Sequence, residues 1–412
     1  MERRSFIKSS LLTSAALLAG SSWLKAETLS SKMKITAVRF YLPPVNNRQL
    51  FNQSRAIIEV ETDGGIIGIG EGGGSKDLIE QCAKMMIGQD PFQIENIWQL
   101  LYRGVFYPPG REKLHAMGGL EMALWDIKGK ALNVPVYELL GGSTRQFVEC
   151  YCTTFTGSKA TTEAGRAVDA LASGLRVYRL HPEGDGAPYD FYASANKTIE
   201  LCKSVFDAVG PGGKWAVDLH TRFDTADAIR ICDKIADMEP FFVEDLVRSE
   251  NKGLYKTIRP MVKVPIAVGE QFGDRWDINE LLENNLIDYS RVTLPNTGGI
   301  GEFRKIANMC ETHYQGMIPH FTGPVSTAAL VHVIGSLPVR AMMELLGGYP
   351  EKPAYLDEGY VDFRNGKLYL KNDPGLGVKF NKKTMTLALE VKEKIAVAHP
   401  LLYRPDGSIN NW

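Results

Sequence analysis

The chain has 412 residues, 44% of them hydrophobic, and its 47 lysine and arginine residues nearly balance 48 aspartate and glutamate residues. A chain of this length can bury a large core and has room for a barrel and a smaller domain, which excludes a single small module. The balanced charge leaves no basic surplus for binding phosphates, so we expect no nucleic-acid partner.

Residues 1–32 have the features of an export signal. Arg3 and Arg4 form a twin arginine, and an apolar stretch follows from Leu11 to Gly20. That stretch is about half as long as the ~20 residues that a membrane-spanning helix requires. The pattern predicts a twin-arginine signal, export to the periplasm or otherwise out of the cytoplasm, cleavage before Met33, and no stable membrane span afterwards.

Residues 33–146 are predicted to form an α+β capping domain. The segments 33–42 and 54–73 are rich in isoleucine and valine, and the sequence Asp63-Gly64-Gly65 supplies a turn between two strands. From residue 77 to about residue 141, apolar residues recur at helical intervals. We therefore expect a hairpin sheet followed by helices.

Residues 147–348 are predicted to form an α/β barrel of the TIM type. Short buried strands alternate here with helices, and the strand candidates are FVECYCTTF, GLRVYRLH, KWAVDLH, PFFVED, VPIAVGE, LIDYSRVT, YQGMIPH and VRAMMELL. Eight is the number of strands that closes a parallel barrel. Polar residues lie near the C-terminal ends of seven of these strands: His181, Asp218, Glu244, Glu270, Thr293, His320 and Glu344.

Residues 349–412 are expected to complete the capping domain, which would then be discontinuous in sequence. Within this segment, residues 359–380 read as a hairpin with a turn at Pro374-Gly375. We expect this hairpin to return to the N-terminal sheet.

Three carboxylates are predicted to meet at one end of the barrel. Asp218, Glu244 and Glu270 end three consecutive predicted strands, at equal steps of 26 residues. The C-terminal ends of parallel strands lie at one face of a barrel, so these side chains converge. Three negative charges repel one another unless a divalent cation lies between them, and ligation by oxygen alone favours Mg²⁺, with Mn²⁺ next. We therefore predict a metal site at these residues.

A family resemblance spans about residues 33–380. It is carried by the strings GGLEMALWDIKGKALNVPVYELLGG, AVDLH, FFVED, AVGEQ, GGI, GPVSTAAL and PGLGV. Together they resemble the enolase superfamily, in particular its mandelate racemase/muconate lactonizing enzyme-like members and the acid-sugar dehydratases similar to mannonate and galactonate dehydratases. The resemblance implies a modified (β/α)7β barrel whose Mg²⁺, held by Asp218, Glu244 and Glu270, binds the substrate carboxylate and stabilises the enediolate formed when the α-proton leaves.

The resemblance also implies roles for Glu344 and for the string DLHTR. Glu344 matches the position that donates a hydrogen bond to the developing oxyanion, for which it must be protonated or share a proton with the substrate. His220 lies two residues after Asp218, so alternation along a strand places both on one face. It is similar to the histidine that protonates the departing β-hydroxyl in sugar-acid dehydratases. Arg222 is expected to hold a hydroxyl group or the carboxylate of the substrate.

Two positions depart from the family's pattern. His320 matches the catalytic histidine of the seventh strand, but Thr293 replaces the aspartate that usually accompanies it. The second strand carries Arg179 and His181 where many members have two lysines. An arginine can bind a carboxylate but does not readily take up a proton, whereas a histidine can. The sequence therefore leaves two candidate bases, His181 and His320, which we expect to face each other across the pocket.

Substrate choice in this family usually depends on loops of the capping domain, which here are residues 41–51 and 72–75. The first loop contains Asn46, Asn47, Arg48 and Gln49, a polar set suited to hydroxyl groups. Asn47 and Arg48 are the candidate substrate-binding residues, and the alternative is a solvated loop without a role.

These predictions favour a lyase that dehydrates an aldonic or uronic-derived sugar acid to a 2-keto-3-deoxy acid. Within the same fold, the alternatives are a racemase or epimerase with two histidine bases, or a cycloisomerase that opens an anhydro-sugar ring. Outside enzymology, the alternative is an exported protein that binds sugar acids without catalysis. In each case we expect a small-molecule carboxylate as ligand and a homo-oligomer.

Overall fold

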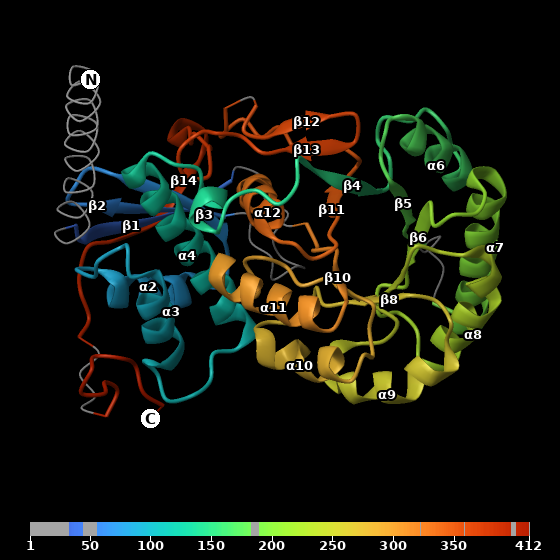
Figure 1. Cartoon of the computed structure of the whole chain (residues 1–412), viewed down its shortest axis with the longest axis horizontal. Coiled ribbons are helices and arrows are strands. Elements are labelled where there is room, and N and C mark those ends of the chain that lie inside the picture. Colours follow the sequence, from blue (N-terminus) through green and yellow to red (C-terminus); the bar gives the residue numbers. More distant parts are fainter. Residues whose placement is uncertain are drawn as a thin grey trace, which may run out of the picture.

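The computed structural model describes residues 33–43, 56–182, 189–321, 323–357, 359–396 and 401–411. A capping domain lies at one end of the molecule and a barrel at the other (Figure 1). The predicted export signal at residues 1–32 lies outside the described residues. None of the described helices is long and apolar enough to cross a membrane.

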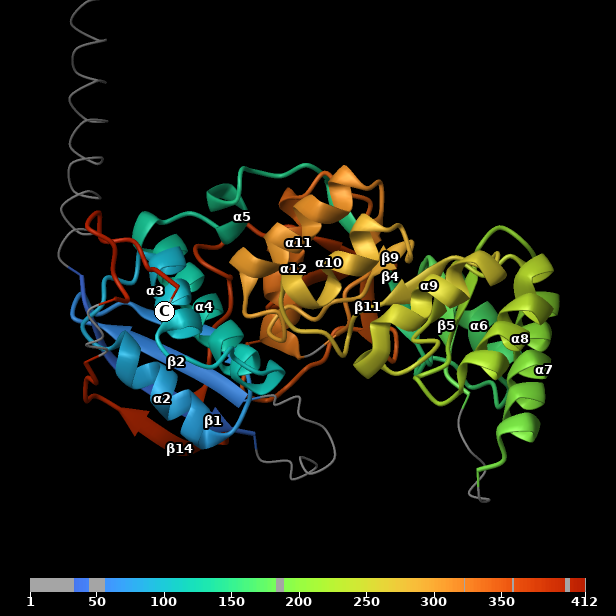
Figure 2. The same ribbon diagram turned by 90° about the horizontal axis from the view of Figure 1, so that it is seen from below.

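The capping domain contains a four-stranded antiparallel sheet in the order β14-β1-β2-β3. Its strands are β1 (Ile35–Leu42), β2 (Ala56–Thr62), β3 (Ile67–Gly72) and β14 (Thr386–Val391). The predicted turn joins β2 to β3, and Gly65 adopts φ 75°, a value that favours glycine. The helices are α2 (Lys76–Met86), α3 (Ile94–Arg103), α4 (Arg111–Leu132) and α5 (Val136–Leu139), and Figure 2 shows α2 and α4 beside the sheet.

Alternating glycines explain how the long helix α4 packs on β3. Gly68, Gly70 and Gly72 share one face of the strand. A Cβ at Gly70 would lie 1.9 Å from the carbonyl oxygen of Gly119 in α4, and one at Gly68 would lie 2.1 Å from that of Ala123. Only strand residues without side chains permit this approach, so the glycines determine where the helix lies.

Eight parallel strands form the barrel, as predicted. They are β4 (Phe147–Thr153), β5 (Val177–Leu180), β6 (Trp215–Asp218), β7 (Val243–Glu244), β8 (Ile266–Val268), β9 (Tyr289–Ser290), β10 (Gly316–Met317) and β11 (Met343–Leu346). Each strand from β4 to β9 pairs with the next, and β11 pairs with β4. A parallel bridge between Met317 and Ala341 joins the remaining seam, which closes the barrel.

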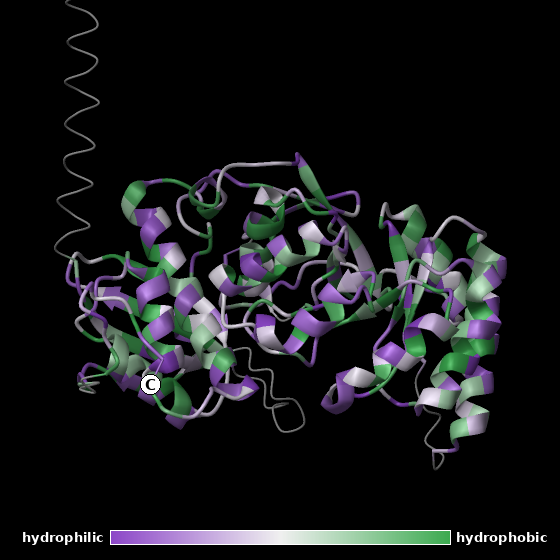
Figure 3. Ribbon diagram, turned by 60° about the horizontal axis from the view of Figure 1, so that its bottom comes forward, coloured by the Kyte–Doolittle hydropathy of each residue, from purple (hydrophilic) through white to green (hydrophobic). Residues whose placement is uncertain are grey.

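Helices follow the first seven barrel strands. The main ones are α6 (Glu163–Ala172), α7 (Phe191–Val209), α8 (Thr225–Ile235), α9 (Tyr255–Ile258), α10 (Arg275–Glu283), α11 (Ile300–Thr312) and α12 (Pro324–Ser336). Short 3-10 helices are η1 (Ala236–Met238), η2 (Ser249–Leu254), η3 (Arg259–Met261) and η4 (Lys382–Thr384). Hydrophobic and hydrophilic residues alternate along the outer helices, as expected where one helix face packs on the barrel (Figure 3). The order confirms the (β/α)7β fold, because the described chain continues from β11 into another strand.

Buried side chains fill the barrel interior. Each of the eight strands supplies one of them, from a residue within the strand or next to its end. These eight residues form a single cluster: Tyr151, Val177, Ala216, Phe242, Ala267, Tyr289, Ile318 and Met342. Three aromatic rings pack here among five aliphatic side chains, so the barrel is a packed core and its strand ends remain available for a site.

The predicted C-terminal hairpin forms in a different place from the one expected. Strands β12 (Asp362–Arg364) and β13 (Lys367–Tyr369) pair with each other, and β13 pairs antiparallel with β4 of the barrel. The turn is Asn365-Gly366, with φ values of 49° and 70°, and not Pro374-Gly375. Asn-Gly favours the two-residue turns that join such strands. The strand that returns to the N-terminal sheet is β14, and the boundaries of the three folded segments stay predictions.

Carboxylates of the capping domain hold the N-termini of two barrel helices. Glu121 of α4 accepts hydrogen bonds from the backbone N–H groups of Ile300 and Gly301, both at 2.8 Å, in the first turn of α11. Glu71 of β3 accepts one from Ser326 in the first turn of α12, also at 2.8 Å. Negative charge is favourable at a helix N-terminus. The cap is therefore attached to the loops that follow β9 and β10.

Candidate active site and metal centre

The predicted metal ligands lie at the C-terminal ends of adjacent strands. Asp218 ends β6 and is the register partner of Glu244, which ends β7, while Glu270 follows β8. Asp218 and Glu244 are fully buried, and the side chain of Glu270 is 13% exposed. The structure therefore brings together carboxylates that are far apart in sequence, as the barrel geometry predicts.

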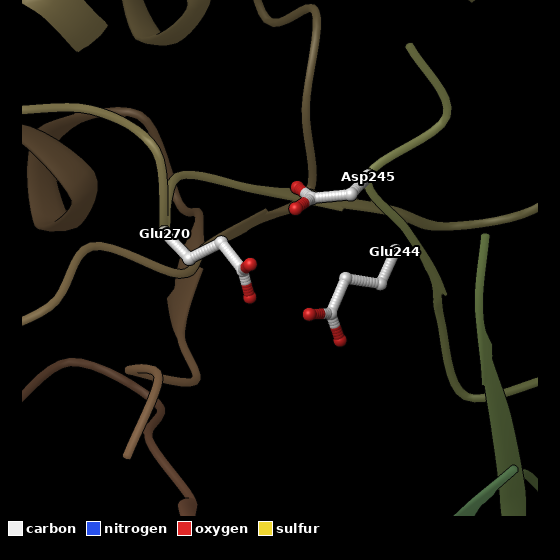
Figure 4. A group of neighbouring side chains, drawn as sticks. All are labelled: Glu244, Asp245 and Glu270. Atoms are coloured by element: carbon white, nitrogen blue, oxygen red, sulfur yellow. The ribbon is translucent and has the colours of Figure 1, made fainter. Parts of the chain in front are cut away.

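One group of carboxylates has the geometry to hold a metal ion. Glu244, Asp245 and Glu270 each offer an oxygen, and these three oxygens lie within 4.8 Å of one another (Figure 4). The predicted ligand Asp218 is not part of this group; its Oδ2 is 3.2 Å from Arg179 Nη1 and 3.1 Å from His181 Nδ1. A donor set made only of carboxylate oxygens fits Mg²⁺, with Mn²⁺ as the next choice.

Two buried arginines connect the carboxylates. Arg179, at the end of β5, places Nη1 2.5 Å from Glu244 Oε2 and Nη2 3.0 Å from Glu344 Oε1. Arg291, just after β9, places Nε 2.6 Å from Glu244 Oε1 and Nη2 2.8 Å from Glu344 Oε2. Its Nη2 is also 3.4 Å from Glu270 Oε2. Each guanidinium group thus offsets part of the negative charge that the carboxylates bring into the barrel.

The contacts of Glu344 favour the ionised carboxylate, whereas the role implied by the resemblance requires a protonated carboxyl group or a proton shared with the substrate. Burial would raise its pKa, but Arg179 and Arg291 outweigh burial and hold the pKa well below its usual range. Thr153, at the end of β4, donates a hydrogen bond of 2.5 Å to Glu344 Oε1 and accepts one of 2.8 Å from Arg179 Nε. Glu344 is therefore held by two guanidinium groups and one hydroxyl group.

Both ring nitrogens of His181 have partners. Arg222 Nη2 lies 2.9 Å from Nε2, and since arginine only donates, Nε2 is the acceptor. Nδ1 then carries the proton and donates to Asp218 at 3.1 Å. The interaction with Arg222 therefore occupies the lone pair with which His181 would act as a base.

His220 lies beside His181, although not for the reason given by strand alternation. The strand β6 ends at Asp218, and His220 adopts φ 50°, in the left-handed region. Its backbone N–H donates to Asp218 Oδ1 at 2.6 Å, and its ring centroid is 4.9 Å from that of His181 in an edge-to-face arrangement. Burial lowers the pKa of His220, which favours the neutral ring near pH 7.

His320 follows β10 and is buried. Its Nε2 lies 3.5 Å from Glu270 Oε2, and burial lowers its pKa despite that neighbouring charge. The hydroxyl of Thr293 is buried and has no hydrogen-bond partner within the described ranges. In the structure, the carboxylate beside His320 is therefore Glu270 rather than a residue at position 293.

The capping loops are only partly described. Asn47 and Arg48 lie outside the described residues, so their assignment as substrate-binding residues stays a prediction. In the loop 72–75, Ser75 Oγ accepts a hydrogen bond of 3.4 Å from Leu78 N and caps α2.

Sequence reasoning missed three residues of the site: Thr153, Asp245 and Arg291. Asp245 follows a predicted ligand directly, but alternation along a strand would turn it to the opposite face. Arg291 gave the clearest signal, because a charged residue within an apolar strand segment must find a partner once the strand is buried. The hydroxyl of Thr153 carried no signal that distinguished it from its neighbours.

Comparison with known families agrees with this geometry. Residues 162–384 match the family model described as enolase C-terminal domain-like. Residues 34–141 match the model of the mandelate racemase/muconate lactonizing enzyme N-terminal domain.

Similar proteins cover almost the whole chain. The D-galactonate dehydratase of Pectobacterium atrosepticum is 31% identical over 396 residues, which cover 92% of this chain and 100% of that protein. The D-mannonate dehydratase of Caulobacter vibrioides is 30% identical over 396 residues, covering 86% and 95%. A crystal structure of an enolase from Pantoea ananatis with bound d-gluconate and Mg aligns with a TM-score of 0.75 at 26% identity, covering 86% of this chain and 94% of that one. On fold, conserved length and site geometry together, the chain belongs to the enolase superfamily, in its mandelate racemase/muconate lactonizing enzyme family.

Proposed function

We propose that the protein is a Mg²⁺-dependent hydro-lyase that removes the proton α to the carboxylate of a sugar acid and expels the β-hydroxyl. The product would be a 2-keto-3-deoxy acid. The observation that carries the proposal is the carboxylate cluster at the C-terminal ends of β6, β7 and β8, next to the paired rings of His181 and His220. The names of the relatives and the d-gluconate bound to the Pantoea ananatis enzyme support this substrate class.

The site residues fit the separate tasks of such an elimination. A bound divalent cation would supply Lewis acidity toward the substrate carboxylate, which makes the α-proton more acidic. Arg179 and Arg291 are buried cations that offset negative charge developing on the substrate. His220, whose burial favours the neutral ring, would have to bind a proton before it protonates the leaving hydroxyl.

An isomerase of the same family is the second candidate. His181 follows β5 and His320 follows β10, so two histidines stand at the same end of the barrel on strands that are not neighbours. Two bases on different sides of one carbon are what a racemase or epimerase requires.

A library of sugar acids assayed with Mg²⁺ distinguishes the candidates. Dehydration yields a keto acid, which semicarbazide traps as an absorbing product, and we expect such a product from at least one aldonic or uronic-derived acid. Turnover that changes optical rotation without a semicarbazide-reactive product would instead establish the isomerase. Binding of sugar acids without any turnover would contradict both and indicate a binding protein.

A further inference from the structure

We infer that Asp245 is a ligand of the metal centre and binds the divalent cation together with Glu244 and Glu270. This inference rests on the proposed function, because it concerns the same metal. It goes beyond the three ligands that the sequence predicts, since Asp245 is not among them.

The backbone turns Asp245 into the site. Strand alternation would direct Glu244 and Asp245 to opposite faces of the barrel wall. Asp245 instead adopts φ 46°, in the left-handed region, which aspartate enters more readily than most residues with a side chain. Two hydrogen bonds hold this conformation: Asp245 N donates to Ala267 O at 3.1 Å, and Asp245 O accepts from Thr221 N at 2.8 Å. The result is that both carboxylates reach the same space as Glu270 (Figure 4).

Asp245 is also the one carboxylate of the centre that forms no ion pair with a basic side chain within the described residues. Ion pairs with Arg179 or Arg291 reach Asp218, Glu244, Glu270 and Glu344. Within the part of the chain that the structure describes, no ion pair reaches Asp245, and its Oδ2 has no hydrogen-bond partner. The residue is only 3% exposed, so water offers little compensation for this charge.

The net charge of the cluster also favours a bound cation. Five carboxylates face two guanidinium groups, which leaves three negative charges in excess when all the carboxylates are ionised and the histidines are neutral. A divalent cation beside Asp245 removes two of these charges and supplies the missing partner of Oδ2. A local departure from strand geometry that directs an unpaired carboxylate toward two others is expected where a cation is to be bound.

The test compares Asp245→Asn with Asp274→Asn. Asp274 is a buried aspartate outside the centre, where it accepts hydrogen bonds from Tyr102 Oη at 2.7 Å and Trp276 N at 3.1 Å. The full-length protein and both variants are freed of metal with EDTA, and Mg²⁺ is titrated by calorimetry. We expect Asp245→Asn to weaken Mg²⁺ binding at least about 10-fold and Asp274→Asn to leave it unchanged.

Thermal unfolding with and without Mg²⁺ provides a second measurement that does not depend on turnover. Mg²⁺ should raise the Tm of the wild-type protein and of Asp274→Asn, but much less that of Asp245→Asn. Asp245→Ser, measured in parallel, should behave like Asp245→Asn, so the test survives if either variant fails to fold. Mg²⁺ affinity in both Asp245 variants equal to or tighter than wild type would overturn the inference. If the wild-type protein itself bound no Mg²⁺, the proposed function would fail instead.

Discussion

At the scale of single residues, the site is an array of buried charges organised by Arg179 and Arg291. Each guanidinium group contacts three carboxylates, and both residues are at most 4% exposed. Buried ion pairs of this kind contribute little net stability, because desolvation offsets the attraction. They do fix the positions of the carboxylates, and a catalytic centre depends on those positions.

Exchange of the α-proton with solvent should distinguish the roles of the three histidines of the site. If His181 takes the α-proton, His181→Asn loses both product formation and exchange of that proton with deuterated solvent. His220→Asn should lose dehydration but keep exchange, because exchange does not require the acid that protonates the hydroxyl. His320→Asn should slow turnover on the order of 10²-fold as the loss of one positioned group. The measurement is deuterium incorporation followed by NMR.

The opposite pattern would assign the base to the other strand. Loss of exchange in His320→Asn alone, with exchange retained in His181→Asn, would show that His320 is the base. The hydrogen bond from Arg222 to His181 would then be kept during the reaction, and His181 would serve to orient Asp218.

The sequence predicted the residues at strand ends well and the residues beyond them poorly. Asp218 and Glu244 lie where parallel strands end, and a regular strand fixes the direction of each side chain. His220 and Asp245 come after the last regular residue, and both adopt left-handed φ values. Their directions depend on local hydrogen bonds, which the alternation of apolar residues does not reveal.

At the scale of elements, helix α12 connects the barrel to the cap. Every residue of this helix is buried, and Glu71 of β3 holds its first turn. His332 in the same helix stacks on Tyr137 of α5 with ring centroids 5.7 Å apart. Burial lowers the pKa of His332 to about 4, and its Nδ1 has no hydrogen-bond partner in the described ranges.

His332 should make the protein sensitive to mild acid. Its folded pKa lies below the unfolded value of about 6.5, so the unfolded state binds the proton first and stability falls as the pH drops from about 6.5 toward 4. Between pH 7 and pH 5 this amounts to about 2 kcal/mol of the free energy of unfolding. Urea unfolding of the wild type and of His332→Gln checks it, since other titrating groups cancel in the difference. An equal pH dependence in both proteins would contradict this role of His332.

The helices and strands were easier to predict from the sequence than the tertiary contacts that they make with one another. All eight barrel strands were predicted because each is a short buried apolar run between turn signals. The placement of the hairpin β12–β13 was wrong, because its pairing with β4 depends on tertiary contacts. The carboxylates Glu71 and Glu121 were not recognised as helix caps, since their helices lie more than 170 residues away in sequence.

At the scale of the whole molecule, the cap and the barrel form one enzyme architecture, and we propose that it functions outside the cytoplasm as a homo-oligomer. A reporter fused to residues 1–32 should be transported to the periplasm, and replacing Arg3 and Arg4 by lysine should stop transport. The measurement is the distribution of the reporter between cell fractions. Transport that survives the double replacement would indicate another export route.

The central claim is metal-dependent removal of an α-proton from a sugar acid, and deuterium exchange tests it most directly. The wild-type protein is incubated in deuterated water with a sugar acid that it binds or turns over, either with Mg²⁺ or with EDTA. Deuterium is followed by NMR at the α-carbon of the substrate and at the β-carbon of the keto-acid product, where the enol takes up a solvent proton. The account predicts incorporation with Mg²⁺, none with EDTA, and recovery when Mg²⁺ is restored. Undiminished incorporation in EDTA, or tight binding of the acid with Mg²⁺ and no incorporation, would contradict it.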